Sequence, residues 1–401
     1  MEIYRMKKSI FALAAATAFS GTAYAQSSVT VYGLLDGGFQ QTKVEYNSTQ
    51  INKQNSIAFG SNNGSGNLSG SRLGFRGIED IGGGNTVGFV LETGINYINQ
   101  TLATTTATHI DQTAASNGTA QNTAALFAAV RQAYLSINNK QFGSLRLGTQ
   151  DSLAKGIEMF DPQGGPNLPG TASLYAQGLV TRYSQAFTYM APKLGGVDIA
   201  LQTTLDGTPT SEGSTTAANV VPAANRSSSI RAIFNQGPIS AGAVYERRST
   251  FGVSSGTTSG MAPVAITGTS ATIVPEINHY GVGASYDLKV VKPSVYYFNT
   301  KANNPSAAAS AGKNSGTLFG LTAPFSTATT GTIAYTMGKS ENNNNAIAYD
   351  TKGLQAVVTH NLSKRSNIYG GYGTVAWNTK YSATALDVKY TTMTIGMRHS
   401  F

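Results

Sequence analysis

Apolar and polar side chains alternate along most of the chain from Ser28 onward, and this period of two restricts the fold more than any other feature. Val29, Val31 and Leu35 fall on one face of such a segment, and Thr30 and Asp36 fall on the other. The same alternation recurs in residues 87–92, 197–202 and 393–398. No long segment has the helical period of 3.6. The chain is therefore predicted to consist of strands with one apolar and one polar face.

Short turn signals and longer polar stretches alternate between these strands. The turn signals lie at residues 79–85, 138–140, 191–193, 235–238, 287–289, 323–326 and 361–365. The longer stretches lie near residues 41–67, 95–126, 151–180, 205–226, 249–276, 301–314, 339–348 and 378–386. Seven short and eight long connections predict sixteen antiparallel strands, with both ends of the chain on the side of the short turns. Strands of about ten residues joined in this way are typical of transmembrane barrels.

Composition argues against a large soluble core. Charged residues make up 12% and hydrophobic residues 40% of the chain, so the missing charge has not been replaced by apolar residues. The 20 Tyr and 16 Phe residues argue against disorder. A soluble sandwich, the alternative for many short strands, would not need an apolar outer face on nearly every strand.

A closed barrel follows from the chemistry of the bilayer. Lipid offers no partner to an unpaired backbone N–H or C=O group, so a sheet that spans the membrane must have no edges. The polar inner faces then need water, and sixteen strands are enough to enclose an aqueous lumen. We therefore expect an all-β, transmembrane antiparallel barrel of sixteen strands.

The first 25 residues have the pattern of an export signal. Positive residues at positions 5, 7 and 8 precede an apolar stretch over 10–19, and Ala23-Tyr24-Ala25 supplies the small-x-small cleavage pattern. Cleavage is expected between Ala25 and Gln26, which leaves residues 26–401 as a single barrel domain. The apolar stretch is too short to span a bilayer as a helix. The chain has no Cys, which excludes disulfides.

The last strand carries a pattern typical of assembly signals. Phe401 lies in phase with Met393, Ile395 and Met397 on the apolar face. A terminal aromatic residue on an amphipathic strand resembles the signal that the outer-membrane assembly machinery reads. A strand that merely ends in Phe is the alternative.

Several short stretches together resemble the general-diffusion porins of beta-proteobacteria. They are residues 26–33, 71–80, 131–134, 142–148, 362–365 and 396–401. The resemblance covers the whole mature chain. It implies a sixteen-stranded trimeric porin of the Gram-negative outer membrane, with short periplasmic turns, long extracellular loops and a third loop that folds into the lumen. Thr149 departs from the family, which usually has Arg at this position.

This resemblance also implies the function and the partners. The expected function is a water-filled channel for passive diffusion of small hydrophilic solutes and ions, in a homotrimer. Its expected surroundings are outer-membrane lipid, lipopolysaccharide and the assembly machinery. A substrate-specific channel, a hydrolase embedded in the barrel and an adhesin that uses the long loops are the alternatives.

The third long stretch, residues 151–180, is expected to be a constriction loop. It carries the acidic residues Asp151, Glu158 and Asp161 and a single Lys, Lys155. Its three prolines and five glycines predict that it forms neither helix nor strand and folds back compactly. A long connection without secondary structure in a compact protein is usually functional or disordered, so a mobile surface loop is the alternative.

Four arginines are predicted to face this loop from the barrel wall. The alternation puts Arg72, Arg76, Arg146 and Arg182 on the polar faces of their strands. An arginine on the lipid face costs roughly 2–4 kcal/mol at the middle of the membrane, which favours the lumen. An acidic loop opposite a basic wall would create a transverse field that sorts solutes by charge. The alternative is that these arginines only satisfy groups near the rim. A weak preference for anions is expected.

Catalytic, metal-binding and nucleic-acid-binding patterns are weak. The histidines lie in four different segments, no G-x-S-x-G stretch occurs, and no His/Asp/Glu cluster has the spacing of metal ligands. No run of Lys and Arg exceeds two residues, which argues against nucleic acid. We expect neither an enzyme nor a bound cofactor.

Overall fold

The computed structural model describes residues 28–46, 53–60, 67–95, 97, 127–163, 168, 180–204, 224–251, 274–303, 312–342, 348–381 and 387–401. These residues form seventeen strands and one 3-10 helix. No helix in the described part of the chain is long and apolar enough to cross a membrane. The expected cleavage point between Ala25 and Gln26, and most of the expected long loops, lie outside the described residues.

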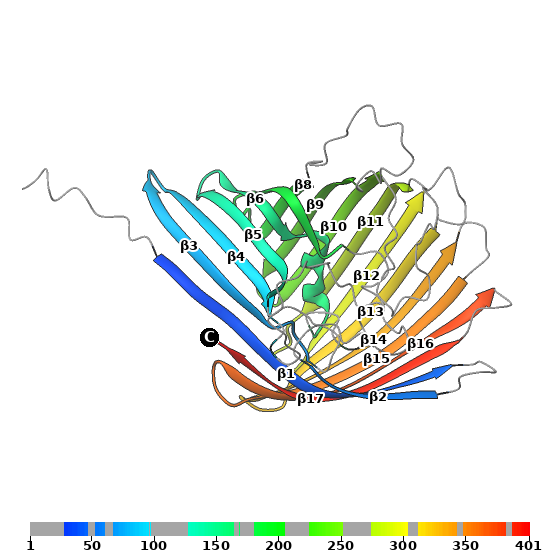
Figure 1. Ribbon diagram of the computed structural model, residues 1–401. Helices are drawn as coiled ribbons and strands as arrows, with labels where there is room; N and C mark the ends of the chain where they lie inside the picture. Colours follow the sequence, from blue (N-terminus) through cyan, green and yellow to red (C-terminus); the bar gives the residue numbers. More distant parts are fainter. Residues whose placement is uncertain are drawn as a thin grey trace, which may run out of the picture.

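The strands form one antiparallel sheet in which neighbours along the chain pair with each other. They are β1 (Ser28–Tyr46), β2 (Lys53–Gly60), β3 (Arg72–Gly82), β4 (Asn85–Ile95), β5 (Phe127–Asn139), β6 (Gly143–Asp151), β7 (Arg182–Met190), β8 (Val197–Thr204), β9 (Ala224–Gln236), β10 (Ile239–Phe251), β11 (Val274–Tyr286), β12 (Lys292–Asn303), β13 (Gly312–Pro324), β14 (Thr329–Asn342), β15 (Ala348–Asn361), β16 (Ser366–Tyr381) and β17 (Val388–Ser400). β17 pairs with β1 from Ser400 opposite Leu34 to Val388 opposite Tyr46, which closes the barrel seen in Figure 1. The predicted antiparallel barrel is confirmed.

Seventeen strands occupy sixteen positions because β2 and β3 follow each other beside β1. Residues 38–45 of β1 pair with β2, and residues 28–34 pair with β3. Asp36 lies between these two pairings. Ser71 takes the place of a strand partner there, since its hydroxyl accepts a hydrogen bond from the Asp36 amide at 3.0 Å and donates one to the Asp36 carbonyl at 3.1 Å.

One connection differs from the prediction. The long loop expected over 41–67 is wrong for most of its length, because β1 continues to Tyr46 and β2 covers Lys53–Gly60. The seven predicted short turns are confirmed and lie together at one end of the barrel (Figure 1).

The two faces of the wall differ as the alternation predicts. In β17 the side chains of Met393, Ile395 and Met397 are 57%, 67% and 55% exposed on the outer face. Thr392 and Thr394 occupy the alternate positions of the same strand and are buried on the inner face. An apolar outer face and a polar inner face suit a wall with lipid outside and water inside.

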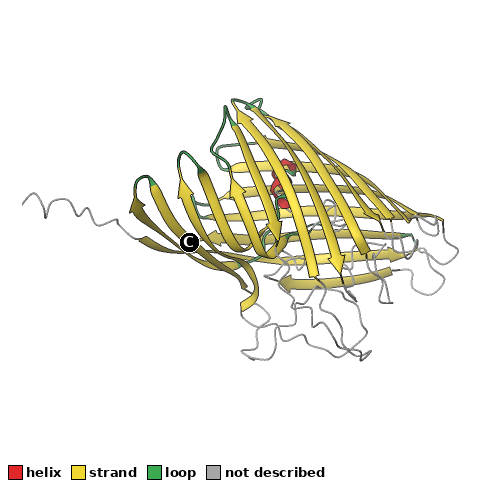
Figure 2. Cartoon of the chain, turned by 90° about the horizontal axis from the view of Figure 1, so that it is seen from above, coloured by secondary structure: helices red, strands yellow, loops and turns green. Residues whose placement is uncertain are grey.

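A 3-10 helix, η1 (Ala154–Phe160), follows β6 and lies inside the barrel (Figures 1 and 2). It packs against the inner faces of β10, β11 and β12. The prediction that residues 151–180 contain no helix is therefore wrong for this part. Pro162 is the first proline of the segment, and η1 ends before it.

Candidate functional site

Two apolar side chains anchor η1 to the inner wall. Ile157 and Phe160 are fully buried, in a cluster that includes Val244 of β10 and Tyr296 of β12. They lie over glycines: a Cβ atom at Gly242 would come within 3.2 Å of both side chains. A Cβ atom at Gly283 of β11 would overlap the ring of Phe160. The glycines thus create the flat surface on which the helix rests.

The same loop contacts the wall again beyond η1. Pro162 lies against Gly320 of β13. Leu168 is buried with Val357 of β15 and Tyr369 of β16, and Leu68 packs against this group. Because these contacts fall on β10 to β13 and on β15 and β16, the described parts of the loop follow the inner wall over several strands.

A carboxylate at the start of the loop is held between two cations. Asp151 Oδ2 lies 2.9 Å from Lys155 Nζ, and Asp151 Oδ1 lies 3.1 Å from Arg182 Nε. Asp151 and Arg182 are direct partners in the pairing of β6 with β7. The structure therefore brings three of the predicted site residues together.

A second carboxylate in this region was missed as a site residue. Glu92 of β4 accepts two hydrogen bonds. Arg131 Nε donates to Oε1 at 2.7 Å, and the Tyr32 hydroxyl donates to Oε2 at 3.1 Å. Arg131 lies at a break in register, where Glu92 faces Gln132 but Thr93 faces Val130. This bulge turns Arg131 to the inner face. Strict alternation would place Arg131 outside together with Ala133, so no signal in the sequence pattern reveals it.

Arg72 lies among these groups. Its charged neighbours are Arg131, Arg182, Glu92 and Asp151. We call these five residues and Lys155 the inner charge cluster. It contains four cations and two carboxylates, so its formal charge is positive by two.

The other two predicted arginines make different contacts. Arg76 lies over the ring of Tyr32, with 5.5 Å from Cζ to the ring centroid, and Arg146 lies over Tyr134 at 5.2 Å. Both are on inner faces, as their strand partners Thr30 and Ser136 indicate. A cation over an aromatic ring is held in place without a carboxylate. One further inner arginine, Arg231 of β9, lies against Gly156 of η1.

The two acidic residues of the loop beyond Asp151 are buried. Glu158 and Asp161 are 7% and 3% exposed. Burial raises the pKa of the Glu158 carboxyl to about 7; the positive charge of Lys155 opposes this shift, and the negative charges of Asp161 and Asp151 add to it. Glu158 therefore changes its charge near neutral pH. Asp161 accepts a hydrogen bond from the Gln163 amide at 2.9 Å.

Phe401, the predicted assembly signal, lies at the seam of the barrel. Its backbone N–H donates to Gly33 at 3.1 Å, and the Gly33 N–H donates to its carbonyl at 3.0 Å. In the described part of the chain, no group of three or more His, Asp or Glu side chains is arranged to hold a metal ion.

Comparison with known proteins gives consistent results. The family model described as "Gram-negative porin" matches residues 12–380. An outer membrane porin protein of Bordetella pertussis is 26% identical over 99% of this chain and all of its own length. Outer membrane porin protein 32 of Delftia acidovorans is 47% identical, over 22% of each chain.

A solved structure has the same fold. The anion-selective porin from Comamonas acidovorans superimposes with a TM-score of 0.65 at 21% identity, and the match covers 94% of this chain and 100% of that one. At this level of identity the comparison concerns the architecture of the barrel.

Proposed function

Because the chain belongs to the Gram-negative porin family, we propose that its channel through the outer membrane is narrowed by the loop at 151–180 and weakly prefers anions. Porins of this family form water-filled channels for small hydrophilic solutes, with short turns at the periplasmic end and long loops outside. Both the narrowing and the preference for anions depend on residues of the inner wall of this barrel.

The proposal rests on the position of η1 inside the barrel. Ile157 and Phe160 fix the helix over Gly242 and Gly283, so this part of the loop occupies space in the lumen. The root of the loop is tied to the wall by the Asp151–Arg182 ion pair at 3.1 Å. A loop fixed at its root and by its apolar residues keeps a constant cross-section for the permeating solute.

The inner charge cluster supports the preference for anions. Only charges within about one Debye length, roughly 8 Å at physiological salt, act strongly on a permeating ion. The four cations and two carboxylates of the cluster carry a formal charge of +2 at the root of the loop, and Asp161 and, above its pKa, Glu158 add negative charge farther along the loop. The similarly folded Comamonas porin is described as anion-selective, in keeping with this proposal.

Reversal potentials in a salt gradient test the proposal. Changing Arg72 and Arg76 to Ser should shift the reversal potential toward cation selectivity, and the shift should shrink at high salt because of screening. Arg247→Gln provides the control, since Arg247 is 62% exposed on its side chain and lies on the outer face, paired with Glu276. An unchanged reversal potential in the double variant would place the narrow point elsewhere.

The proposal also covers the assembly, processing and surroundings of the barrel. We infer a homotrimer, recognition of Phe401 by the assembly machinery, cleavage between Ala25 and Gln26, and contact with outer-membrane lipid and lipopolysaccharide. The chain is proposed to act as a channel and not as an enzyme.

A further inference from the structure

Two sets of inward-facing residues on the barrel wall have the same arrangement. Each consists of a tyrosine, the glycine that is its register partner on the neighbouring strand, and an arginine two residues from that glycine toward the short turns. The first set is Tyr32, Gly74 and Arg76, and the second is Tyr134, Gly148 and Arg146. In both sets the arginine lies over the tyrosine ring, with 5.5 Å and 5.2 Å from Cζ to the ring centroid. We call the two sets the arginine steps.

The guanidinium groups of the arginine steps are open to the lumen. Arg76 is exposed and Arg146 is half-buried. In the described part of the barrel neither of them forms an ion pair, whereas Arg131 and Arg182 lie 2.7 and 3.1 Å from a carboxylate oxygen. Arg76 and Arg146 therefore keep N–H donors for an anion that passes along the wall.

The tyrosine rings of the arginine steps are open as well. Tyr32 and Tyr134 are half-buried on the inner face. The Tyr32 ring lies across Gly74, where a Cβ atom would overlap it, and its hydroxyl donates to Glu92 at 3.1 Å. Tyr134 is one of the groups that interact electrostatically with Tyr32. The two steps thus lie close together and present aromatic rings beside cations.

A third set of the same kind is closed by the chain itself. Tyr369 of β16 is the register partner of Gly396 of β17, and Arg398 lies two residues beyond this glycine. Tyr369 is only 3% exposed, because it is buried in one cluster with Leu168 of the loop. Arg398 donates to the Ser69 hydroxyl at 3.0 Å. An apolar group held against such a tyrosine therefore occurs once within the barrel, and the two open steps can receive one from a solute.

The groups of an open step match a particular class of anion. A spherical anion such as chloride can use only the guanidinium group. A carboxylate fits the planar fork of the guanidinium with two parallel hydrogen bonds. An aromatic ring attached to that carboxylate gains a further contact with the tyrosine ring or the guanidinium face. A solute that has both parts uses every group that the step offers.

We propose that the two arginine steps bind aromatic carboxylates, which the channel therefore takes up in preference to other monovalent anions of similar size. The carboxylate lies at Arg76 or Arg146, and the ring packs beside Tyr32 or Tyr134. This site rests on the proposed preference for anions and names a class of solute within it.

Block of the chloride current by two matched solutes tests the proposal. Benzoate and cyclohexanecarboxylate each carry one carboxylate on a six-membered ring, and only benzoate is aromatic. In the unaltered channel, benzoate should halve the single-channel chloride current at an about fivefold lower concentration, the effect expected from one favourable ring contact. Equal concentrations for the two solutes would overturn the proposal, and this comparison needs no variant.

Removal of the rings locates the site. The double variant Tyr32→Leu, Tyr134→Leu should make the two solutes equally effective. Tyr32→Phe, Tyr134→Phe keeps both rings but loses the hydroxyl bond to Glu92, and it should retain the fivefold difference. A difference that persists in the leucine variant, with the heat-dependent gel mobility of a folded barrel, would contradict the assignment to the arginine steps.

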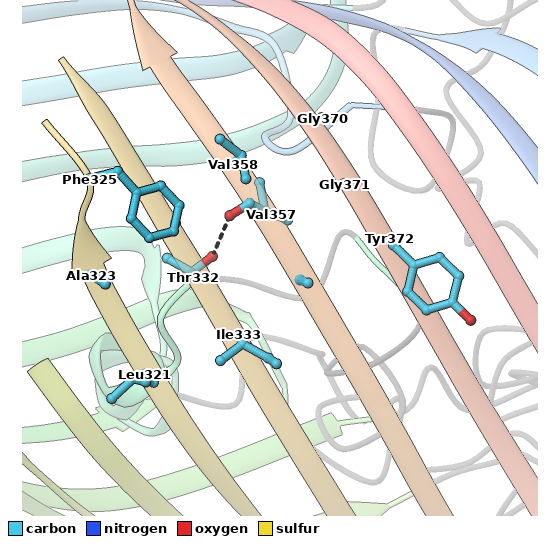
Figure 3. Close-up of a pocket in the computed structure, with 12 residues that line it drawn as sticks. Leu321, Ala323, Phe325, Thr332, Ile333, Val357, Val358, Gly370, Gly371 and Tyr372 are labelled. Carbon is cyan, nitrogen blue, oxygen red and sulfur yellow. Dashed lines mark hydrogen bonds between the residues drawn. The ribbon is translucent and has the colours of Figure 1, made fainter. Parts of the chain in front are cut away.

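Tyr372→Leu is the matched control on the other side of the wall. Tyr372 of β16 faces outward, as its register partner Met393 indicates, and it lies beside the outer hollow shown in Figure 3. The control should retain the preference for benzoate. Loss of the preference in Tyr372→Leu would mean that benzoate acts from the outer face and would overturn the proposal.

Reversal potentials in a potassium chloride gradient separate this proposal from the proposed function. A channel that prefers anions but blocks equally with the two solutes would contradict the aromatic site alone. A channel without anion preference would contradict the proposed function. Anion preference together with the fivefold difference supports both.

Discussion

Phe401 and Gly33 exchange both of their backbone hydrogen bonds, at 3.0 and 3.1 Å. The Phe401 ring lies over Gly33, where a Cβ atom would overlap it. The two residues are far apart in sequence, yet they complete the seam between β17 and β1 at its periplasmic end. The aromatic residue is thus both part of the proposed assembly signal and part of the closed wall.

Phe401→Ala should lower the amount of folded barrel in the outer membrane several-fold and leave precursor in the periplasm. The ring that covers Gly33 is lost, so the end of the last strand keeps its backbone bonds but loses its side-chain contact and the terminal aromatic group. The measurement is the fraction of heat-modifiable protein in outer-membrane extracts. Phe142→Ala is the matched control, since Phe142 is 71% exposed in a short turn. Equal amounts for both variants would contradict the role of Phe401.

Met159→Cys should give a channel that a bulky charged thiol reagent blocks. Met159 lies on η1 with 42% of its surface exposed, and the chain has no other Cys. Attachment of the reagent adds volume and charge beside the solute path. Single-channel current before and after labelling is the measurement. Leu194→Cys, 62% exposed beyond β7, should be labelled without loss of current. Labelling of Met159→Cys at constant current would place η1 away from the path.

Anion preference should decrease as pH rises from 5 to 8. Burial holds the pKa of Glu158 at about 7, so the side chain is neutral below this pH and gains a negative charge above it. The added charge lies within the loop and offsets part of the positive inner charge cluster. Reversal potentials across this pH range measure the effect, and Glu158→Gln should flatten the profile. A profile that is unchanged in Glu158→Gln would assign the titration to another group.

Asp36→Ala should destabilise the barrel by about 3 kcal/mol, the order expected when a buried acceptor is removed and several buried donors are left without a partner. Asp36 is fully buried and accepts hydrogen bonds from the Ser69 amide at 2.7 Å and the Tyr369 hydroxyl at 2.5 Å. The midpoint of unfolding in denaturant is the measurement. Asp287→Ala, in an exposed turn, is the control, and similar midpoints for the two variants would contradict the expected effect.

The alternation of side chains predicts the barrel because it is a local property of each strand: successive residues point in turn to the lumen and to the lipid. It failed for the upper part of β1 and for β2, where a loop over 41–67 is predicted instead. The segment Gln40–Glu45 has the composition Gln-Gln-Thr-Lys-Val-Glu, which is polar on both faces. The upper part of β1 rises above the lipid and meets water on both sides, so it carries no apolar stripe to recognise; in β2 only Ile57 and Phe59 alternate, which is too short a pattern to predict a strand.

The site was predictable only in part, for a similar reason. Asp151, Lys155 and Arg182 are close in sequence or at facing strand ends, and the structure brings them together. Arg131 was missed because a bulge shifts its phase. The helix η1 was missed because its stability comes from Phe160 packing over Gly283, and residues so far apart in sequence leave no local pattern.

The hydroxyl of Ser71, which bonds both backbone groups of Asp36, makes the wall independent of what joins β2 to β3. The register of β3 with β1 is fixed by its own pairing from Arg72 onward. Residues added between Gly60 and Asn67 would therefore leave the closure of the barrel unchanged. This makes the junction between β2 and β3 an insertion point for a sensing peptide in an engineered nanopore.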